Sequence, residues 1–408
     1  MTGPGPQIRP LSQDDDLDAE AELRHQAFGP MDKAARDRTL AVAAEAVAAG
    51  CVVGAFVGGR LIGTARYLDM RQWWHGRSTA MAGVSGVKVA PEARGRGVGR
   101  ALMTELLGMI AQRGYPVSVL YPATTPIYRS LGWELAGGLY HATVPARSLG
   151  ALLRPDAGPA PPPPPASLRR AGPDDAAEVI GIIGAAHEAA RHCGPATRAA
   201  GEVRRLLSDP HLFSYLASDG FLAYRWHGGG HELLVECAVA SSAQTTREIW
   251  SVVGSHASIA QRVRALLAPD DPVAWLTREA DVGLAERTPW MLRILDARAA
   301  IAARGFPGPA AVSAVLQLDD PRLPANSGQW MLEVSGGKGT LTPSRTDNRG
   351  PVPPVPPVEL GARGFAALFA GVPLATLRRA GLAAGGGTGT DDALDCAFAG
   401  TAFLLDDF

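Results

Sequence analysis

The sequence predicts an α/β (α+β) fold made of several units, in which mixed β-sheets are covered by helices. The chain has 408 residues, more than one hydrophobic core usually organises. Short β-rich runs alternate with amphipathic helical stretches, which is typical of units that pack helices on sheets. The opening pattern of the chain also returns after a proline-rich break, which indicates a duplicated unit.

Composition excludes several classes of function. Charged residues make up 19% of the chain and the formal net charge is -1, so no overall basic field exists for nucleic acid. No apolar run approaches the roughly 18 residues that suggest a membrane span. The first residues lack the basic and apolar regions of a secretory signal, and we therefore expect a cytoplasmic protein.

Neither a disulfide framework nor a metal site is predicted. The four cysteines form no C-x-x-C pair, and we expect them to be reduced and mostly buried. His187 and His192 lie on one helical stretch with Cys193, but a spacing of five does not put two histidines on one helix face.

Proline-rich and glycine-rich segments divide the chain. An unbroken polyproline run adopts an extended, solvated conformation, and one lies at residues 161–165. A second proline-rich stretch lies at 351–357 and a flexible glycine loop at 385–389. We therefore assign a first domain, a linker, a second domain and a third domain, with the boundaries 1–154, 155–167, 168–290 and 291–408.

In the first domain the expected elements follow one another as strands and helices. A short strand at residues 8–10 precedes a helix at 14–28, whose opening acids suit its positive end. Two β-rich runs then flank the Gly58-Gly59 dipeptide, a hairpin signal. Further strands are expected at 84–90 and 117–121, with a helix between them that ends near residue 113.

The second domain reads as a degenerate copy of the first. Residues 168–175 echo residues 8–15, and each segment runs into an alanine-rich amphipathic helix. No glycine-rich phosphate loop follows in the second copy, so we expect it to serve packing and pocket walls. The third domain is predicted to be a smaller α+β unit, with strands at 312–318, 329–334 and 339–342 and helices at 363–370 and 374–380.

One segment of the first domain carries a chemical signal. A strand ends near Pro91, a glycine-rich turn follows, and a helix with one apolar stripe then begins. Such a turn aims several backbone N–H groups and the positive end of the helix at one point, which makes an anion site. The turn spans seven residues: Arg94, Gly95, Arg96, Gly97, Val98, Gly99 and Arg100.

This R-x-x-G-x-G spacing, carried by Arg94, Gly97 and Gly99, resembles the GCN5-related N-acetyltransferase (GNAT) superfamily. Members bind the pyrophosphate of acetyl-CoA on such a loop after a splayed strand. The resemblance implies that Gly95 to Arg100 hold the pyrophosphate. It also implies that backbone groups of the preceding strand, with Ala123 and Thr124 downstream, line the rest of the cosubstrate, and the strand residues concerned are Val87, Lys88 and Val89.

Tyr128 is the candidate general acid. It lies in an I-Y-x-x-x-G-aromatic run that is also familiar in the GNAT superfamily, where this tyrosine sits beside the sulfur of the departing thiol. A phenol has a reference pKa near 10 and a thiol one of about 8.5, so hydrogen-bond stabilisation is favoured over full proton transfer. The alternative is a packed aromatic side chain on a short helix.

Further motifs narrow the resemblance to the enhanced intracellular survival (Eis) family of aminoglycoside acetyltransferases. They are the segments at 288–295, 303–306 and 400–403, close to Phe408. The resemblance implies an active GNAT domain, a degenerate second one, and a sterol-carrier-like third domain that brings the C-terminus to the active site. It also implies a hexamer that acetylates several amines of one substrate.

The same resemblance implies the acceptor side of the site. The terminal carboxylate of Phe408 would be the general base, although a free α-carboxyl, with a pKa around 3.5, is a weak one. Phe28 would form an aromatic wall. The residues themselves indicate an anionic pocket for a polyamine, made of Asp406, Asp407 and the terminal carboxylate. The alternative for these acids is a solvated tail. Trp73-Trp74-His75 reads as a pocket rim or a surface covered by another subunit.

The predicted function is direct transfer of an acetyl group from acetyl-CoA to primary amines of an aminoglycoside or similar polyamine. No metal is required, and the partners expected are a small-molecule substrate and other copies of the chain. Two alternatives stay open: acetylation of protein lysines or small polyamines, and a non-catalytic lipid or ligand carrier with a vestigial transferase domain.

Overall fold

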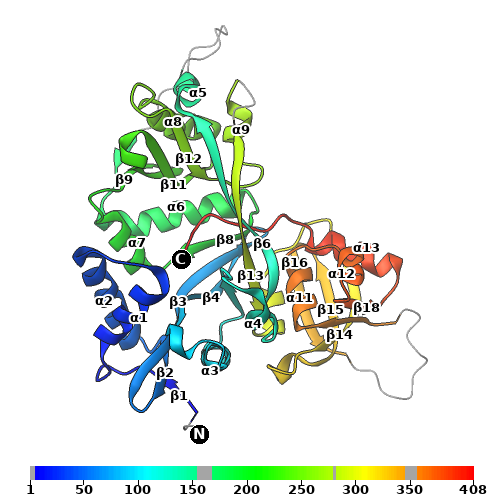
Figure 1. The fold of residues 1–408 in the computed structure, drawn as a ribbon. Coiled ribbons are helices and arrows are strands. Elements are labelled where there is room, and N and C mark those ends of the chain that lie inside the picture. The colour runs from blue at the N-terminus through cyan, green and yellow to red at the C-terminus, as the bar shows by residue number, and fades with distance from the viewer. Residues whose placement is uncertain (1–4, 154–167, 279–281, 345–355) are drawn as a thin grey trace, which may run out of the picture.

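The computed structural model describes residues 5–153, 168–278, 282–344 and 356–408. Figure 1 shows three units: an N-terminal unit in blue and cyan, a second unit in green and yellow-green, and a third unit in orange and red. The predicted mixed α/β class is confirmed. The linker and most of the second proline-rich stretch lie outside the described residues.

The N-terminal unit contains the expected strands and helices in the predicted order, together with α2, β6 and α5, which were not predicted. Gly58 and Gly59 have φ of 56° and 80°, so the predicted hairpin turn uses the left-handed region that glycine tolerates. The elements are β1(Gln7–Pro10), α1(Leu17–Phe28), α2(Lys33–Ala48), β2(Val52–Val57), β3(Arg60–Trp74), β4(Arg77–Val89), the 3-10 turn Pro91–Ala93, α3(Val98–Gln112), β5(Val117–Leu120), α4(Thr125–Arg129), β6(Glu134–Pro145), α5(Ala146–Gly150) and the 3-10 turn Ala151–Leu153.

The second unit repeats much of this order. Its elements are β7(Arg169–Arg170), the 3-10 turn Pro173–Asp175, α6(Ala176–Ala189), β8(Cys193–Arg198), α7(Ala200–Leu207), β9(Phe213–Ala217), β10(Gly220–His227), the 3-10 turn Gly228–Gly230, β11(Glu232–Ala240), α8(Ala243–Gly254), β12(Arg262–Leu266), α9(Val273–Leu276) and β13(Gly283–Ile294).

The third unit holds a separate five-stranded sheet with the order β16-β15-β14-β17-β18. The predicted glycine loop at 385–389 is partly regular structure, because β18 includes Gly385 and α13 begins at Thr388. The elements are α10(Ala297–Ala303), β14(Val312–Asp319), the 3-10 turn Pro324–Asn326, β15(Gly328–Ser335), β16(Lys338–Pro343), β17(Val358–Gly361), α11(Ala362–Phe369), α12(Leu374–Arg379), β18(Ala383–Gly385), α13(Thr388–Phe398) and β19(Phe403–Leu404).

The first two units share one sheet, in which 14 strands of the described chain take part, with β19 of the tail as one of them. β13 lies between β5 and β6 and is antiparallel to both, although it follows them by about 140 residues of chain. β6 then pairs with β12 of the second unit, and β8 pairs with β3. The two units are therefore joined by strand pairing as well as by side-chain contacts.

The hairpin of β3 and β4 is longer than the sequence indicated, and it carries Trp73-Trp74-His75 into the interior between units. Trp74 is fully buried, with its ring 5.0 Å from the Phe369 ring and 6.4 Å from the Trp290 ring. The prediction of a pocket rim or subunit surface is wrong for Trp74. The indole is buried because β3 crosses the region where all three units meet.

The C-terminal tail runs back from the third unit to the first. β19 pairs in parallel with β6, with Phe403 opposite Gly138 and Leu404 opposite Leu139. A Cβ on Gly137 would lie 2.1 Å from the carbonyl oxygen of Ala402, so only glycine allows this close approach. In Figure 1 the C-terminus lies between the first and second units.

Two further sequence expectations concern membrane-spanning helices and the state of the cysteines. No helix of the described chain is both long and apolar enough to cross a bilayer. All four cysteines are free, and two are buried, one is intermediate and one is exposed, so the expectation of mostly buried thiols holds only in part.

Candidate active site

Two neighbouring strands separate at the centre of the site. β4 pairs with β5 from Met81 to Val84, and it then continues to Val89 without a partner on that side. Its other side carries a bulge, because the pairing with β3 passes from Ser85 to Lys88 while β3 advances by one residue less. Backbone groups of Val87 to Val89 therefore face an open edge, as expected for the predicted cosubstrate-binding strand.

The glycine-rich turn forms an amide-lined bend at the start of α3. Gly95 and Gly97 have φ of 73° and 80°, and Gly97 is the N-cap residue without a side-chain cap. A Cβ on either glycine would meet nothing within 4 Å, so the space above the bend is open. Among the described residues, no backbone carbonyl accepts a hydrogen bond from the amides of 95–100. These amides fit a phosphate group.

The other residues of the bend brace the preceding strand, pack against neighbours or leave their side chains unpaired. The Arg94 Nε donates to the backbone oxygen of Val89 at 3.1 Å and thereby braces the end of β4. Val98 is buried, and Gly99 packs so that a Cβ would lie 3.3 Å from Ile127. The side chains of Arg96 and Arg100 form no hydrogen bond with a described residue, which leaves both guanidinium groups available to an anion.

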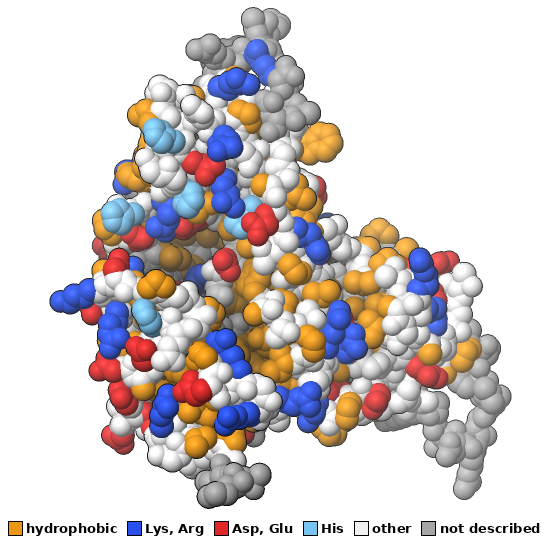
Figure 2. Space-filling view, in the orientation of Figure 1, with side chains coloured by type: hydrophobic (Ala, Val, Ile, Leu, Met, Phe, Trp, Pro, Cys, Tyr) orange, Lys and Arg blue, Asp and Glu red, His pale blue; other side chains and the backbone are white. Residues whose placement is uncertain are grey.

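A cavity of about 710 Å³ adjoins the open edge of β4. This volume suits a small-molecule site. Figure 2 shows a hollow on this face, where the C-terminus lies in Figure 1. The lining brings together side chains from α1, α2, β3, β4, α4 and the tail, and includes the predicted Phe28, Val87, Lys88, Ala123, Tyr128, Asp407 and Phe408.

Tyr128 lines this cavity from α4. The residue is 6% exposed, and burial raises the pKa of its phenol above the usual value. Its hydroxyl has no hydrogen-bond partner among the described residues. The phenol is therefore held protonated, with its proton free to be donated into the cavity. Thr124 is the N-cap residue of α4 and makes no side-chain cap, and it does not line the cavity.

The tail reaches the cavity through Asp407 and Phe408. The Phe408 ring lies 5.4 Å from the Tyr121 ring and packs on β4, where a Cβ on Gly83 would come within 2.8 Å of it. The Tyr121 hydroxyl donates to the backbone oxygen of Asp406 at 2.5 Å. The surrounding protein desolvates the Asp407 carboxylate and raises its pKa.

Asp406 does not face this cavity, in contrast to the expected anionic pocket. Its carboxylate accepts hydrogen bonds from Arg198 of β8, at 2.7 Å from Nε and 2.5 Å from Nη2. Arg198 also donates to the backbone oxygen of Asp407. Burial alone would lower the pKa of Arg198, but the carboxylates of Asp406, Glu202 and Asp407 together raise it. The second unit therefore anchors the tail.

A buried ion pair forms one wall of the cavity and was not predicted. The Lys88 ammonium of β4 contacts the Glu20 carboxylate of α1, and both side chains are almost fully buried. Burial lowers the pKa of Lys88. The sequence held no signal for this pair, because 68 residues separate its members and only the packing of α1 on β4 brings them together. Phe28 lies at the rim with 61% of its surface exposed.

His187 and His192 contact each other, contrary to the spacing argument. Their Nδ1 atoms are 3.1 Å apart, because α6 ends at Ala189 and Arg191 turns the chain back with φ of 50°. Burial lowers the pKa of His187 to about 3. Among the described residues, no group of three histidine, cysteine or acidic side chains is placed to hold a metal ion.

Family profiles match three segments of the chain. The profile described as acetyltransferase (GNAT) domain matches residues 7–136, and a second profile with the same description matches 201–294. A profile described as sterol carrier protein domain matches 297–404. The first match includes the glycine bend, the open edge of β4 and Tyr128.

Relatives match over most of their length. N-acetyltransferase Eis of Mycobacterium tuberculosis is 31% identical over 309 residues, which cover 71% of this chain and 73% of the relative. A GCN5-related N-acetyltransferase structure from Kribbella flavida has a TM-score of 0.90 at 42% identity and covers 99% of this chain and 98% of its own. Eis1 of Mycobacterium abscessus shares the fold, with a TM-score of 0.75 at 23% identity and coverage of 98% and 100%.

These matches agree with the tandem arrangement of two GNAT-like units and a sterol-carrier-like unit seen in the structure. GNAT acetyltransferases use acetyl-CoA as the acetyl donor, and the amide-lined bend and open strand edge suit that molecule. The protein is an acetyltransferase, and the chain belongs to the Eis family of GNAT N-acetyltransferases.

Proposed function

We propose that the protein transfers the acetyl group of acetyl-CoA directly to a primary amine of a small acceptor bound in the 710 Å³ cavity. The observation that carries this proposal is the continuity of the site along β4. The strand lines the cavity with Val87 and Lys88, and the bend with its unpaired amides follows directly after it. A phosphate-binding element and an acceptor cavity thus share one strand.

Bound acetyl-CoA supplies the acetyl group as a reactive thioester. The backbone N–H groups of Val87 to Val89, on the open edge of β4, polarise the carbonyl that the amine attacks. Tyr128 holds a proton on its hydroxyl oxygen, because burial raises its pKa, and donates a hydrogen bond to the developing thiolate. The α-carboxylate of Phe408 takes the proton of the amine. In this scheme Arg94, Arg96 and Arg100 assist the bend in holding the phosphates.

Polyamines and aminoglycosides are the acceptors implied by the family resemblance. Asp407 on the cavity wall supports an amine-binding role at the tail. Protein lysine remains a second acceptor to test. For the carrier alternative, the cavity between β13 and the third sheet measures about 10 Å³, room for about one water molecule and too small for a lipid.

A hexameric assembly and a cytoplasmic location are also part of the proposal. Trp275, Leu284 and Ile259 are 83%, 65% and 59% exposed on the second unit and its connecting strand, and such side chains suit a subunit contact. Light scattering on a size-exclusion column tests the subunit number, and a monomer would contradict it. Cell fractionation tests the location.

The test of the proposal compares two glycines. Gly97 and Gly114 have similar φ, 80° and 78°, and open space at the Cβ position, but only Gly97 belongs to the bend. Alanine at either position costs about 1 kcal/mol of stability. We expect Gly97→Ala to weaken acetyl-CoA binding about tenfold in calorimetry, and Gly114→Ala to leave it unchanged.

Coenzyme A release is then measured with aminoglycosides, linear amines and lysine peptides as acceptors. Release that depends on an acceptor, together with formation of an amide product, supports the proposal. Equal acetyl-CoA affinity in both glycine variants, or no release with any amine, would overturn it.

A further inference from the structure

The cavity walls carry three arginines without an acidic partner. Arg24 of α1, Arg38 of α2 and Arg66 of β3 line the cavity, and none of their guanidinium groups forms a hydrogen bond or ion pair with a described residue. Arg36, two residues before Arg38 on α2, pairs with Asp18 at 2.7 Å and does not line the cavity. On α2, the arginine outside the cavity is therefore paired and the one that lines it is not.

The nearby acids are already neutralised. Glu20 contacts the Lys88 ammonium, Glu202 pairs with Arg198 at 3.5 Å, and Glu45 pairs with Arg205. Glu20 and Glu202 act on Arg66 only through space. The remaining lining acids are Asp407 and the tail carboxylate, and they belong to the opposite wall.

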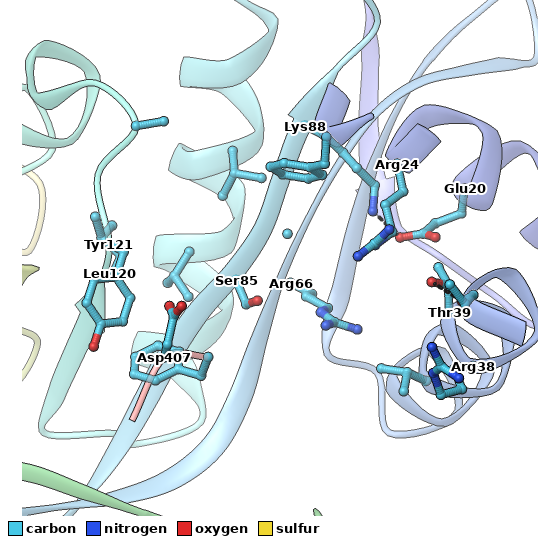
Figure 3. Close-up of a pocket in the computed structure, with 18 of the residues that line it drawn as sticks. Glu20, Arg24, Arg38, Thr39, Arg66, Ser85, Lys88, Leu120, Tyr121 and Asp407 are labelled. Carbon is cyan, nitrogen blue, oxygen red and sulfur yellow. Dashed lines mark hydrogen bonds and ion pairs between the residues drawn. The ribbon is translucent and has the colours of Figure 1, made fainter. Parts of the chain in front are cut away.

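The two kinds of charge are separated across the cavity. Figure 3 shows Asp407 and Tyr121 on one side, Arg24 and Arg38 with the helical wall on the other, and Ser85 and Arg66 between them. The proposed function gives the proton of the amine to the tail carboxylate, so the reacting amine belongs near the tail. The arginine side lies beyond it, where the rest of an acceptor would extend.

Of the three arginines, Arg66 is the one whose charged form is destabilised most by its surroundings. Its Nε atom is buried without a hydrogen-bond partner, and burial lowers its pKa. A guanidinium group in such surroundings gains strongly from an anion, because carboxylate and phosphate oxygens accept its hydrogens in charge-assisted hydrogen bonds. A second positive charge on an acceptor would instead be placed beside three cations.

We propose that the acceptor is a primary amine that also carries a carboxylate or phosphate group, with its amine toward Asp407 and its anionic group against Arg24, Arg38 and Arg66. This inference rests on the proposed function and names its substrate class. In the reaction the C–N bond forms as the thioester C–S bond breaks. The amine loses one proton to the tail side, and the coenzyme A thiol gains one.

The first experiment compares acceptors of equal length. Coenzyme A release is measured with 5-aminopentanoate, pentylamine and 1,5-diaminopentane, with 2-aminoethyl phosphate and kanamycin as further arms. We expect kcat/KM for the aminocarboxylate or the aminophosphate to exceed that of the diamine by about tenfold or more, because a charged hydrogen-bonded contact is gained.

The second experiment uses matched variants on one helix. Arg38→Gln should lower kcat/KM for the anionic acceptor about tenfold and narrow its advantage over the diamine, whereas Arg36→Gln should change neither. Arg38 is exposed, so its loss leaves the core intact. The affinity for acetyl-CoA should be the same in both variants, which excludes a role of Arg38 in binding the cosubstrate phosphates.

The outcomes separate the two proposals. Preference for the diamine or kanamycin over the anionic amines would overturn this inference and leave the acetyltransferase proposal standing. Equal effects of Arg38→Gln and Arg36→Gln would also overturn it. If none of the amines is acetylated although acetyl-CoA binds, both proposals fail together.

Discussion

The two GNAT-like units build the same strand–helix–strand crossover and differ at the start of its helix. β4 and β5 pair in parallel on either side of α3, as β11 and β12 do on either side of α8. α3 begins after Gly97, which has no side-chain cap. α8 begins after Ser242, whose hydroxyl accepts from the Thr245 amide at 3.2 Å. The second helix satisfies its own amide, while the first leaves its amides to a ligand.

The cavities of the two units also differ, in the charge of the side chains that line them. The first unit has a cavity of about 710 Å³, with unpaired arginines on one wall and the acids of the tail on the other. The second has one of about 400 Å³ whose lining is mostly aliphatic, between α6, α7 and the sheet. Both cavities touch the tail at Asp407. The second unit thus has the fold of the first without a glycine bend before its helix α8. It supports the first unit because Arg198 holds the tail.

The largest expected effect tests the chemical role of the first unit. Replacing Tyr128 with Phe removes the hydroxyl and keeps the ring, so the fold should be preserved. We expect kcat to fall by about a hundredfold, with acetyl-CoA affinity unchanged, because the proton donor is lost. Steady-state kinetics and calorimetry measure both quantities. Turnover near that of the unchanged protein would exclude Tyr128 from the reaction.

The next effect tests whether the second unit supports the tail. Arg198→Met leaves the Asp406 carboxylate without its partner, and the end of the chain should detach. We expect about a tenfold loss of kcat/KM and faster hydrogen exchange at the tail, with acetyl-CoA binding preserved. Arg225→Met removes an arginine of the same cavity that pairs with Asp209 and Glu236, and it serves as the control. Identical losses in both variants would contradict a specific anchor.

The third prediction concerns the dependence of the free energy of unfolding on pH, through His187 of the second unit. Burial holds the pKa of His187 in the second unit at about 3, against an unfolded value near 6.5, so the unfolded chain binds the extra proton between these values. Stability should therefore fall as pH decreases, by about 1 kcal/mol from pH 6.5 to 5.5. Urea unfolding of the protein and of His187→Leu at both pH values measures this effect. An unchanged pH dependence in the variant would argue against it.

The smallest effect concerns the capped helix of the second unit. Ser242→Ala removes the hydroxyl that accepts from the Thr245 amide and should cost about 1 kcal/mol of stability. Neither acetyl-CoA affinity nor turnover should change, because this helix end is not assigned to a ligand. Thermal unfolding and steady-state kinetics check this, and a loss of acetyl-CoA binding would show that the two helix ends share a function.

The sequence determined the local parts of this protein. Gly58-Gly59, the Gly95 and Gly97 bend and the apolar stripe of α3 are set by backbone preferences and by periodicity within a few residues, and the structure has a turn and a helix at these places. The same local signals carried the family resemblance. The contact of His187 with His192 was missed, because the spacing argument assumed a continuous helix and α6 ends at Ala189.

Only the tertiary structure decided which charges face one another. Glu20 and Lys88 lie 68 residues apart, and Arg198 and Asp406 lie 208 apart, so no pattern along the chain predicts either contact. Pairing these groups left Arg24, Arg38 and Arg66 without partners and turned Asp406 away from the cavity. Charge is a property of each residue, but its neutralisation depends on which elements the fold packs together.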